Sequence, residues 1–224
     1  MAEFKFPTET VDLPSKGYFY VDGHPLSSGK VEIKYMTAKA LIVDKTINIH
    51  DMVVGDKNAI MVAARILGYG KEYGFEYGGE EHEIDLSKLN PVKLDFKKMT
   101  KGVNEFSFNL PTSKRIVTFK LLNGHDENKI AIELKAREKI SKIQSSELTT
   151  RLKTMLLSVD GNSDQEYINN FVETEFLSRD SLAFRKHLNE ITPDMDMTTM
   201  IVDSGGKETE VTIPVTVRFF WPNT

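Results

Sequence analysis

The sequence predicts an α+β protein, with a mixed, mainly antiparallel β lobe built from N-terminal, middle and C-terminal segments and with helical insertions. Three observations favour this fold class: alternating apolar positions near both ends of the chain, helical periodicity in two internal stretches, and a strand-turn-strand motif that occurs twice. Because the strand pattern returns late in the chain, we expect one discontinuous domain over residues 1–224 instead of two sequential domains.

The boundaries of these parts follow from the points at which the periodicity changes. The chain has 224 residues, of which 40% are hydrophobic, and is long enough to bury a sizeable core. The β lobe is assigned to residues 1–36, 71–122 and 197–222, and the helical parts to residues 40–68 and 125–192.

The N-terminal segment has the pattern of strands and turns. Pro14 and Gly17 stand in a Pro-Ser-Lys-Gly turn, where proline sets the first dihedral angle and glycine allows a positive φ. Residues 30–35 alternate and predict a strand. The side chains expected on one face of this strand are Val31, Ile33 and Tyr35.

The first predicted helix covers residues 57–67. Asp56 is its candidate N-cap and Gly68 its expected end. Its apolar stripe consists of Ala59, Ile60, Ala63, Ala64 and Leu67.

The repeated motif is EYGGEEHEIDL at residues 76–86, which aligns without a gap with DSGGKETEVTI at residues 203–213. Each copy has an acidic residue, a Gly-Gly turn, two glutamates two residues apart, and an alternating strand. We therefore expect two similar hairpins that pack together and hold distant parts of the β lobe in contact.

A further hairpin is expected from residues 106–110 and 115–121, with a turn at residues 111–114. Residues 126–143 and 147–159 then have helical periodicity. The apolar positions of the second helix are Leu148, Leu152, Met155, Leu156 and Val159.

Residues 160–162 break this helix, and Ser163 with Glu166 forms a capping box for the next one. That helix carries Ile168, Phe171 and Val172. Another short helix over residues 181–190 ends before Pro193. Strict alternation over residues 211–219 predicts a final strand, in which Pro214 indicates an edge or a bend.

Aromatic residues near both ends are candidate partner-binding residues, because aromatic side chains are enriched at protein interfaces. The alternative for each of them is packing in the core. The candidates are Tyr18, Phe19, Tyr20, Phe220 and Trp221.

Composition limits the classes of function. The net charge of −4 gives no general attraction to nucleic acid or membranes, and no apolar run reaches the length of a membrane span. The chain has no cysteine, which excludes a thiolate nucleophile and cysteine-ligated metal. We expect no nucleic-acid, membrane or small-molecule partner.

The sequence nominates no catalytic residue, cofactor site or metal site, and we predict that the protein is not an enzyme. The main alternative is a metal-dependent hydrolase that uses the acidic cluster Glu80–Asp85. The same cluster has a structural interpretation as the solvated face of a strand whose Ile84 and Leu86 point inward. Residues 72–85 are acidic and residues 135–153 basic, which indicates either solvated faces or complementary protein surfaces.

Seven segments occur in the order of a known family. They are DLPSKGYFY (12–20), KVEIKYMTAK (30–39), VGDKNAIMVAARILGYGKEY (54–73), FSFNLPTSKRIVTFKLLNG (106–124), ELTTRLKTMLLSVDG (147–161), FRKHLNEITPDMDM (184–197) and VTIPVTVRFFWP (211–222). Together they resemble the baseplate hub assembly proteins of T-even-type contractile-tailed bacteriophages.

The resemblance implies a non-enzymatic phage tail protein that promotes assembly of the central baseplate hub by binding other hub or tail proteins. It implies action in the host cytoplasm during assembly, as a chaperone-like factor or as a structural component of the virion baseplate.

The chain departs from the family pattern at two places. Relatives carry Cys-x-x-Cys at turns like the two Gly-Gly turns, where this chain has Phe75 and Gly78, and Val202 and Gly205. The family's zinc site therefore does not transfer, and packing or a partner must replace its stabilising effect. The acidic helical segment that follows MTAK in the family is also missing after Lys39.

Overall fold

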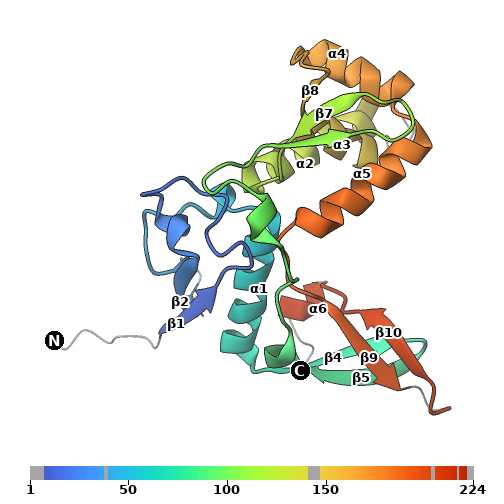
Figure 1. Ribbon diagram of the computed structural model, residues 1–224. Helices are drawn as coiled ribbons and strands as arrows, with labels where there is room; N and C mark the ends of the chain where they lie inside the picture. The colour runs from blue at the N-terminus through green and yellow to red at the C-terminus, as the bar shows by residue number, and fades with distance from the viewer. Residues whose placement is uncertain (1–7, 38–39, 141–146, 203–204, 216, 221–224) are drawn as a thin grey trace.

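The computed structural model describes residues 8–37, 40–140, 147–202, 205–215 and 217–220. Helix α1 (Val54–Tyr69) stands in the middle of the molecule, and three groups of elements surround it (Figure 1). Helices and antiparallel strands are mixed along the described chain, so the predicted α+β class is confirmed.

The N-terminal sheet packs against one side of α1. Its strands are antiparallel and in the order β1-β2-β3, with Val11 of β1 opposite Val31 of β2. Val31 and Ile33 are buried as predicted, whereas Tyr35 is 41% exposed near the end of its strand. The strands are β1 (Thr8–Asp12), β2 (Lys30–Thr37) and β3 (Ala40–Ile42).

The predicted role of Asp56 as a helix cap is wrong. Helix α1 begins at Val54, so Asp56 lies inside its first turn, and its carboxylate is fully buried. Ser15 of the predicted turn donates to that carboxylate from its backbone nitrogen (2.8 Å) and its hydroxyl (2.5 Å). A partner 41 residues away, and not the helix end, thus determines the position of this aspartate.

Two further predictions for this part are confirmed. Gly17 has a φ of 75°, as the turn requires. The expected stripe of α1 faces the core, and the helix continues one residue beyond Gly68. Its stripe residues in the N-terminal core are Ala59, Ile60, Ala63 and Leu67.

The upper group combines a three-stranded sheet with four helices (Figure 1). The predicted hairpin is confirmed, and a third strand pairs with β7 in the order β6-β7-β8. The elements are β6 (Phe106–Asn109), β7 (Ile116–Phe119), β8 (Leu156–Val159), α2 (Gly124–Ile140), α3 (Glu147–Met155), α4 (Gln165–Asn170) and α5 (Ser178–Ile191).

The helix predicted to run to Val159 ends at Met155, and the next four residues form β8. Leu156 and Val159 are buried from this strand, while Leu148 is 39% exposed. A short apolar run suits a strand as well as a helix, and the free edge of β7 decides between them.

The capping box at Ser163 is also wrong. Asp164 is the N-cap of α4, and its side chain accepts the backbone N–H of Tyr167 at 2.8 Å. The helix carries Ile168 into the core and continues in a π turn, Phe171–Glu175. Helix α5 appears where the sequence predicts it and is longer by about one turn.

The third group consists of the two Gly-Gly hairpins, β4–β5 and β9–β10, which we call the hairpin pair. Both are antiparallel as predicted, and they share one core in which Tyr73 and Phe75 meet Ile201 and Val211. Tyr73 also donates from its hydroxyl to the carbonyl of Pro214 at 2.9 Å. The elements are β4 (Glu72–Tyr77), β5 (Glu80–Asp85), β9 (Thr198–Val202), β10 (Glu208–Thr212) and α6 (Val217–Phe220).

The final strand expected over residues 211–219 ends at Thr212. Pro214 lacks the N–H that a strand ladder needs, and Val217–Phe220 turns into the short helix α6. Phe219 is nevertheless fully buried in the core of the hairpin pair, on the same side as Val211 and Ile213.

The described strands form four separate sheets instead of one continuous lobe. The β6-β7-β8 sheet shares its core with α3, α4 and α5, while α1 contacts both the N-terminal sheet and the hairpin pair. Leu188 and Ile191 of α5 pack against two of the cores. The single discontinuous domain over residues 1–224 stays a prediction, and these shared contacts agree with it.

Candidate partner-binding surface

The outer face of β9–β10 carries apolar side chains next to carboxylates. Met200 is 56% and Val202 57% exposed, while Ile201 between them is buried. Their cross-strand neighbours on β10 are Glu210 and Glu208 respectively. Two adjacent apolar side chains on a solvated strand face gain free energy when a partner covers them.

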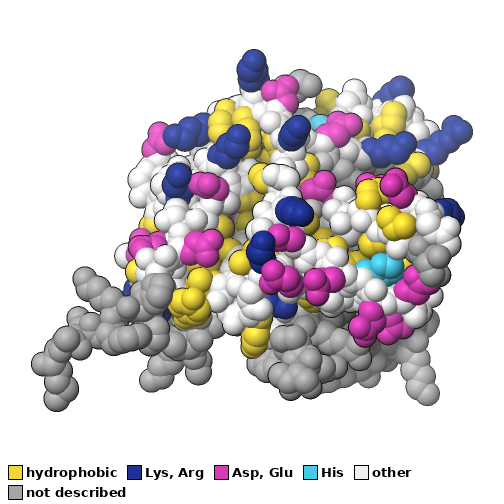
Figure 2. Space-filling model, turned by 90° about the horizontal axis from the view of Figure 1, so that it is seen from below, with side chains coloured by type: hydrophobic (Ala, Val, Ile, Leu, Met, Phe, Trp, Pro, Cys, Tyr) yellow, Lys and Arg dark blue, Asp and Glu magenta, His cyan; other side chains and the backbone are white. Residues whose placement is uncertain are grey.

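The other hairpin carries negative charge on its own outer face, which points away from the core shared with β9–β10. Glu76 of β4 lies directly opposite Glu81 of β5, and Glu83 follows two residues later on the same exposed face. Directly opposed like charges destabilise a sheet. Figure 2, which views the molecule from below, shows acidic side chains spread over this face among lysines and arginines. A basic partner would relieve this repulsion.

A further exposed apolar side chain of the hairpin pair is Tyr77. It is 47% exposed at the end of β4, beside the turn formed by Gly78 and Gly79. By alternation Tyr77 shares the face of Tyr73 and Phe75, so it does not lie on the outer face with Met200 and Val202. We call the outer face of β9–β10, with Met200, Val202, Glu208 and Glu210, the hairpin surface.

The acidic cluster Glu80–Asp85 does not converge on one point. Asp85 forms an ion pair with Lys71 at 3.0 Å and accepts hydrogen bonds from the hydroxyl (2.5 Å) and N–H (2.9 Å) of Ser87. The Ser87 hydroxyl and the Lys71 ammonium lower the pKa of Asp85 to about 2. Leu86 is buried and Ile84 packs against the core, so the strand is arranged as the structural interpretation expects. Within the described residues, no group of three or more acidic or histidine side chains is placed to hold a metal ion.

The aromatic candidates have different positions. Phe19 and Tyr20 are 5% and 7% exposed in the N-terminal core, so the fold leaves little of either for a partner. Tyr18 is half-buried and donates to the carbonyl of Met99 at 3.1 Å. Phe220 is half-buried against the core of the hairpin pair. Trp221 lies outside the described residues.

The hairpin surface was missed because its signal is weak. Alternation in the strand 198–202 places Met200 and Val202 on one face and the buried Ile201 on the other. The pattern thus predicts that Met200 and Val202 share a face. The sequence does not say which face of a strand meets solvent when both faces carry apolar residues.

The most buried polar cluster centres on Asp56. The hydroxyl of Tyr20 donates to the carboxylate of Asp56 (2.7 Å) and accepts the backbone N–H of Val53 (3.1 Å). Burial raises the pKa of Asp56 and also that of Tyr20, which lies beside the carboxylate. All the oxygen atoms involved are occupied by groups of the same core, which is the arrangement of a structural cluster.

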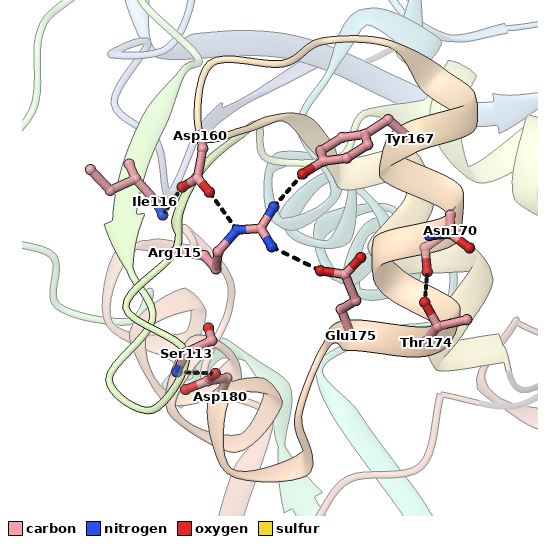
Figure 3. A network of polar contacts seen from close by, with 9 residues as sticks. All are labelled: Ser113, Arg115, Ile116, Asp160, Tyr167, Asn170, Thr174, Glu175 and Asp180. Atoms are coloured by element: carbon pink, nitrogen blue, oxygen red, sulfur yellow. Dashed lines mark hydrogen bonds and ion pairs between the residues drawn. The ribbon is translucent and has the colours of Figure 1, made fainter.

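A second polar cluster surrounds Arg115 (Figure 3). Its guanidinium donates to Asp160, Tyr167 and, at 2.8 Å, to Glu175, and lies over the ring of Phe171. These contacts join the residue before β7 to the turn after β8, to α4 and to the π turn. The cluster thus braces the upper group.

The Asp180 carboxylate makes a similar link within the upper group (Figure 3). It accepts the N–H groups of Thr112 (2.7 Å) and Ser113 (2.9 Å), and so fixes the β6–β7 turn to α5.

A polar hollow of about 510 Å³ lies beside α2 and α3. Two lysines in it, Lys120 and Lys153, are paired with Asp126 and Glu173.

Comparison of the chain with protein families, with curated proteins and with solved structures gives no match. No helix among the described residues is long and apolar enough to cross a membrane.

Proposed function

We propose that this chain is a non-enzymatic phage tail protein that promotes assembly of the central baseplate hub by binding other hub or tail proteins. The observation that carries the binding role is the hairpin surface, on which Met200 and Val202 stand exposed beside Glu210 and Glu208. The resemblance of the seven ordered segments to the baseplate hub assembly family supports the phage assignment. The proposal places the protein in the host cytoplasm during assembly, and in the virion baseplate if it stays bound.

The chemistry of the hairpin surface defines the partner's contact. A partner that covers Met200 and Val202 removes their apolar surface from water, and each Å² buried contributes about 25 cal/mol to the free energy of binding. The nearby carboxylates favour lysine or arginine on the partner. Glu210 and Glu208, which lie directly opposite the two apolar side chains, are the carboxylates nearest to such a cation. The expected partner surface is apolar at its centre and basic at its rim.

Co-purification from cells that express this chain with individual hub proteins tests the proposal. We expect one hub protein to co-purify with the unmodified chain, and the double variant Met200→Gln, Val202→Thr to lose it. Both side chains are more than half exposed, and the uncharged replacements add no negative charge opposite Glu210 and Glu208, so the fold should tolerate the changes. The matched control is Ile132→Gln on α2, where a 69% exposed apolar residue lies outside the hairpin surface.

Two outcomes contradict the proposal: no hub protein co-purifies, or the double variant retains its partner as well as the control does.

The copy number of the protein in purified tails separates a chaperone-like role from a structural one. Absence from mature tails leaves the chaperone-like version, and a fixed copy number supports the structural one.

A further inference from the structure

Within the part of the chain that the structure describes, no strand pairs with the outer edge of β1. The N–H of Leu13 donates to the carbonyl of Gly29 at 2.8 Å, which makes Leu13 and Gly29 a hydrogen-bonded pair of the antiparallel ladder. Alternation then directs the backbone groups of Thr10 and Asp12 away from β2. Among the described residues, no backbone or side-chain hydrogen bond reaches this outer edge.

An apolar groove of about 690 Å³ runs beside this edge. Helix α1 borders it on one side, β1 on another, and the segment after β5 on a third. Glu9, Val11, Asp12 and Leu13 all line the groove, so it follows most of the length of β1. Its main apolar lining residues are Val11, Leu13, Val62, Ile66, Leu86 and Leu89.

The groove carries opposite charges along its length. Glu9 of β1 is exposed at one end, and Lys16, in the turn that follows β1, is exposed toward the other. The strand rises about 13 Å between the Cα atoms of Glu9 and Leu13. The turn that contains Lys16 follows directly after Leu13. Lys30 is engaged with Asp12 at 3.3 Å, while the Lys16 ammonium lies 5.6 Å from the ring centre of Phe96.

We propose that this groove and the free edge of β1 bind an extended segment of another protein as an added β-strand. The segment has apolar side chains at alternate positions, which enter the groove beside Val62 and Ile66. Its backbone pairs with Thr10 and Asp12. It carries a basic residue near Glu9 and an acidic residue near Lys16.

Three features together select this occupant. Backbone pairing on a sheet edge supplies affinity without regard to sequence, and alternate pockets supply specificity. A small apolar molecule would use the groove alone and leave the edge of β1 unpaired. The oppositely charged ends orient a peptide that spans the groove. The site is separate from the hairpin surface, and its existence does not depend on the proposed role in phage tails.

The probe for the test is a fluorescein-labelled peptide of sequence Lys-Val-Thr-Val-Thr-Val-Glu, titrated with the full chain and followed by fluorescence anisotropy. We expect saturable binding that weakens severalfold with the variant Glu9→Lys. In an extended strand the N–H groups of the valines point to one edge and those of the threonines to the other. We therefore expect N-methylation of one set to weaken binding at least tenfold and N-methylation of the other to have little effect.

A matched pair of protein variants tests the edge of β1 directly. Thr10→Pro removes an outward N–H without removing a bond to β2, and proline is tolerated at such edge positions. We expect it to weaken binding of the probe about tenfold, whereas Thr10→Ala changes binding less than twofold. Thermal unfolding of both variants verifies that the sheet is intact, and the methylated peptides test the unmodified chain independently.

The proposal is overturned if the probe fails to bind, if the two methylated peptides bind equally well, or if Thr10→Pro binds like Thr10→Ala. A probe that binds but is insensitive to all of these changes occupies the groove as an apolar ligand only, and this result also rejects the added strand.

Discussion

The hydroxyl of Tyr20 donates a 2.7 Å hydrogen bond to the carboxylate of Asp56, and both side chains are buried. This contact joins the N-terminal turn to the first turn of α1. Ser15 adds two more hydrogen bonds to the same carboxylate. The aspartate thus lies where the start of α1, the N-terminal turn and the N-terminal sheet meet. Its removal should therefore weaken the packing of all three elements.

Replacement of Tyr20 by phenylalanine should destabilise the protein. The change removes the donor to Asp56 and also the acceptor of the Val53 N–H, so two buried groups lose a partner. We expect a loss of about 1–3 kcal/mol in the free energy of unfolding. Urea unfolding measures it. Tyr35→Phe is the control, because Tyr35 is 41% exposed, and an equal loss in both variants would contradict the role of Tyr20.

The Asp56 carboxyl should make stability depend on pH in a defined direction. Burial raises its pKa in the folded state above the ordinary value of 3.8, so the folded protein binds this proton more tightly than the unfolded chain. The resulting stabilisation is complete below pH 3.8 and is lost as pH rises through the folded pKa.

The variant Asp56→Asn does not titrate at this position and therefore isolates the effect. The excess stability of the unmodified protein over this variant should be greatest near pH 3 and should fall toward neutral pH. Paired urea unfolding between pH 3 and pH 8 measures the difference. An excess that grows with pH would show that the carboxylate, and not the protonated acid, is preferred in the fold.

The Asp85 carboxyl should act in the opposite sense. The Ser87 hydroxyl and Lys71 lower its folded pKa from 3.8 to about 2. Its stabilisation is therefore present above pH 3.8 and is lost as pH falls toward about 2. We expect Asp85→Asn to unfold at a lower temperature than the unmodified protein at pH 7, and the two melting temperatures to converge near pH 2. A difference that persists at pH 2 would assign the effect to a cause other than titration.

The parts of the fold that the sequence predicts are those with local determinants. The hairpin pair follows from alternation and Gly-Gly turns, and α5 from its periodicity and the proline after it. Asp56 was misassigned because its partners Ser15 and Tyr20 lie 41 and 36 residues away. The strand β8 depends in the same way on the free edge of β7, which no local pattern reveals.

The candidate surface was harder to predict than the fold. The sequence nominated Phe19 and Tyr20, which are aromatic but lie in the core. It passed over Met200 and Val202, because an alternating apolar strand does not show which of its faces another element will cover. The exposure of a residue is a property of tertiary packing and not of its own segment.

The close approach of α1 to the segment after α5 should make Gly55 irreplaceable. A Cβ atom at this position would stand 1.7 Å from the carbonyl oxygen of Pro193, which is backbone and cannot rotate away. We expect Gly55→Ala to cost at least about 2 kcal/mol in the free energy of unfolding. Gly74→Ala is the control, since its nearest atom lies at 3.9 Å and an alanine in a strand loses less entropy on folding. Equal stability of the two variants would mean that the two segments separate readily in solution.

The guanidinium of Arg115 should contribute to stability through its shape as well as its charge. It donates in different directions to Asp160, Tyr167 and Glu175, and a lysine keeps the charge but not the planar fork. We expect Arg115→Lys to lower the free energy of unfolding by about 1–2 kcal/mol in urea unfolding. Lys101→Ala, which removes an exposed ion pair with Asp22, is the control and should change it by less than about 0.5 kcal/mol. If the two variants are equally stable, the upper group is held by its apolar core alone, and the π turn and the turn after β8 need no polar brace.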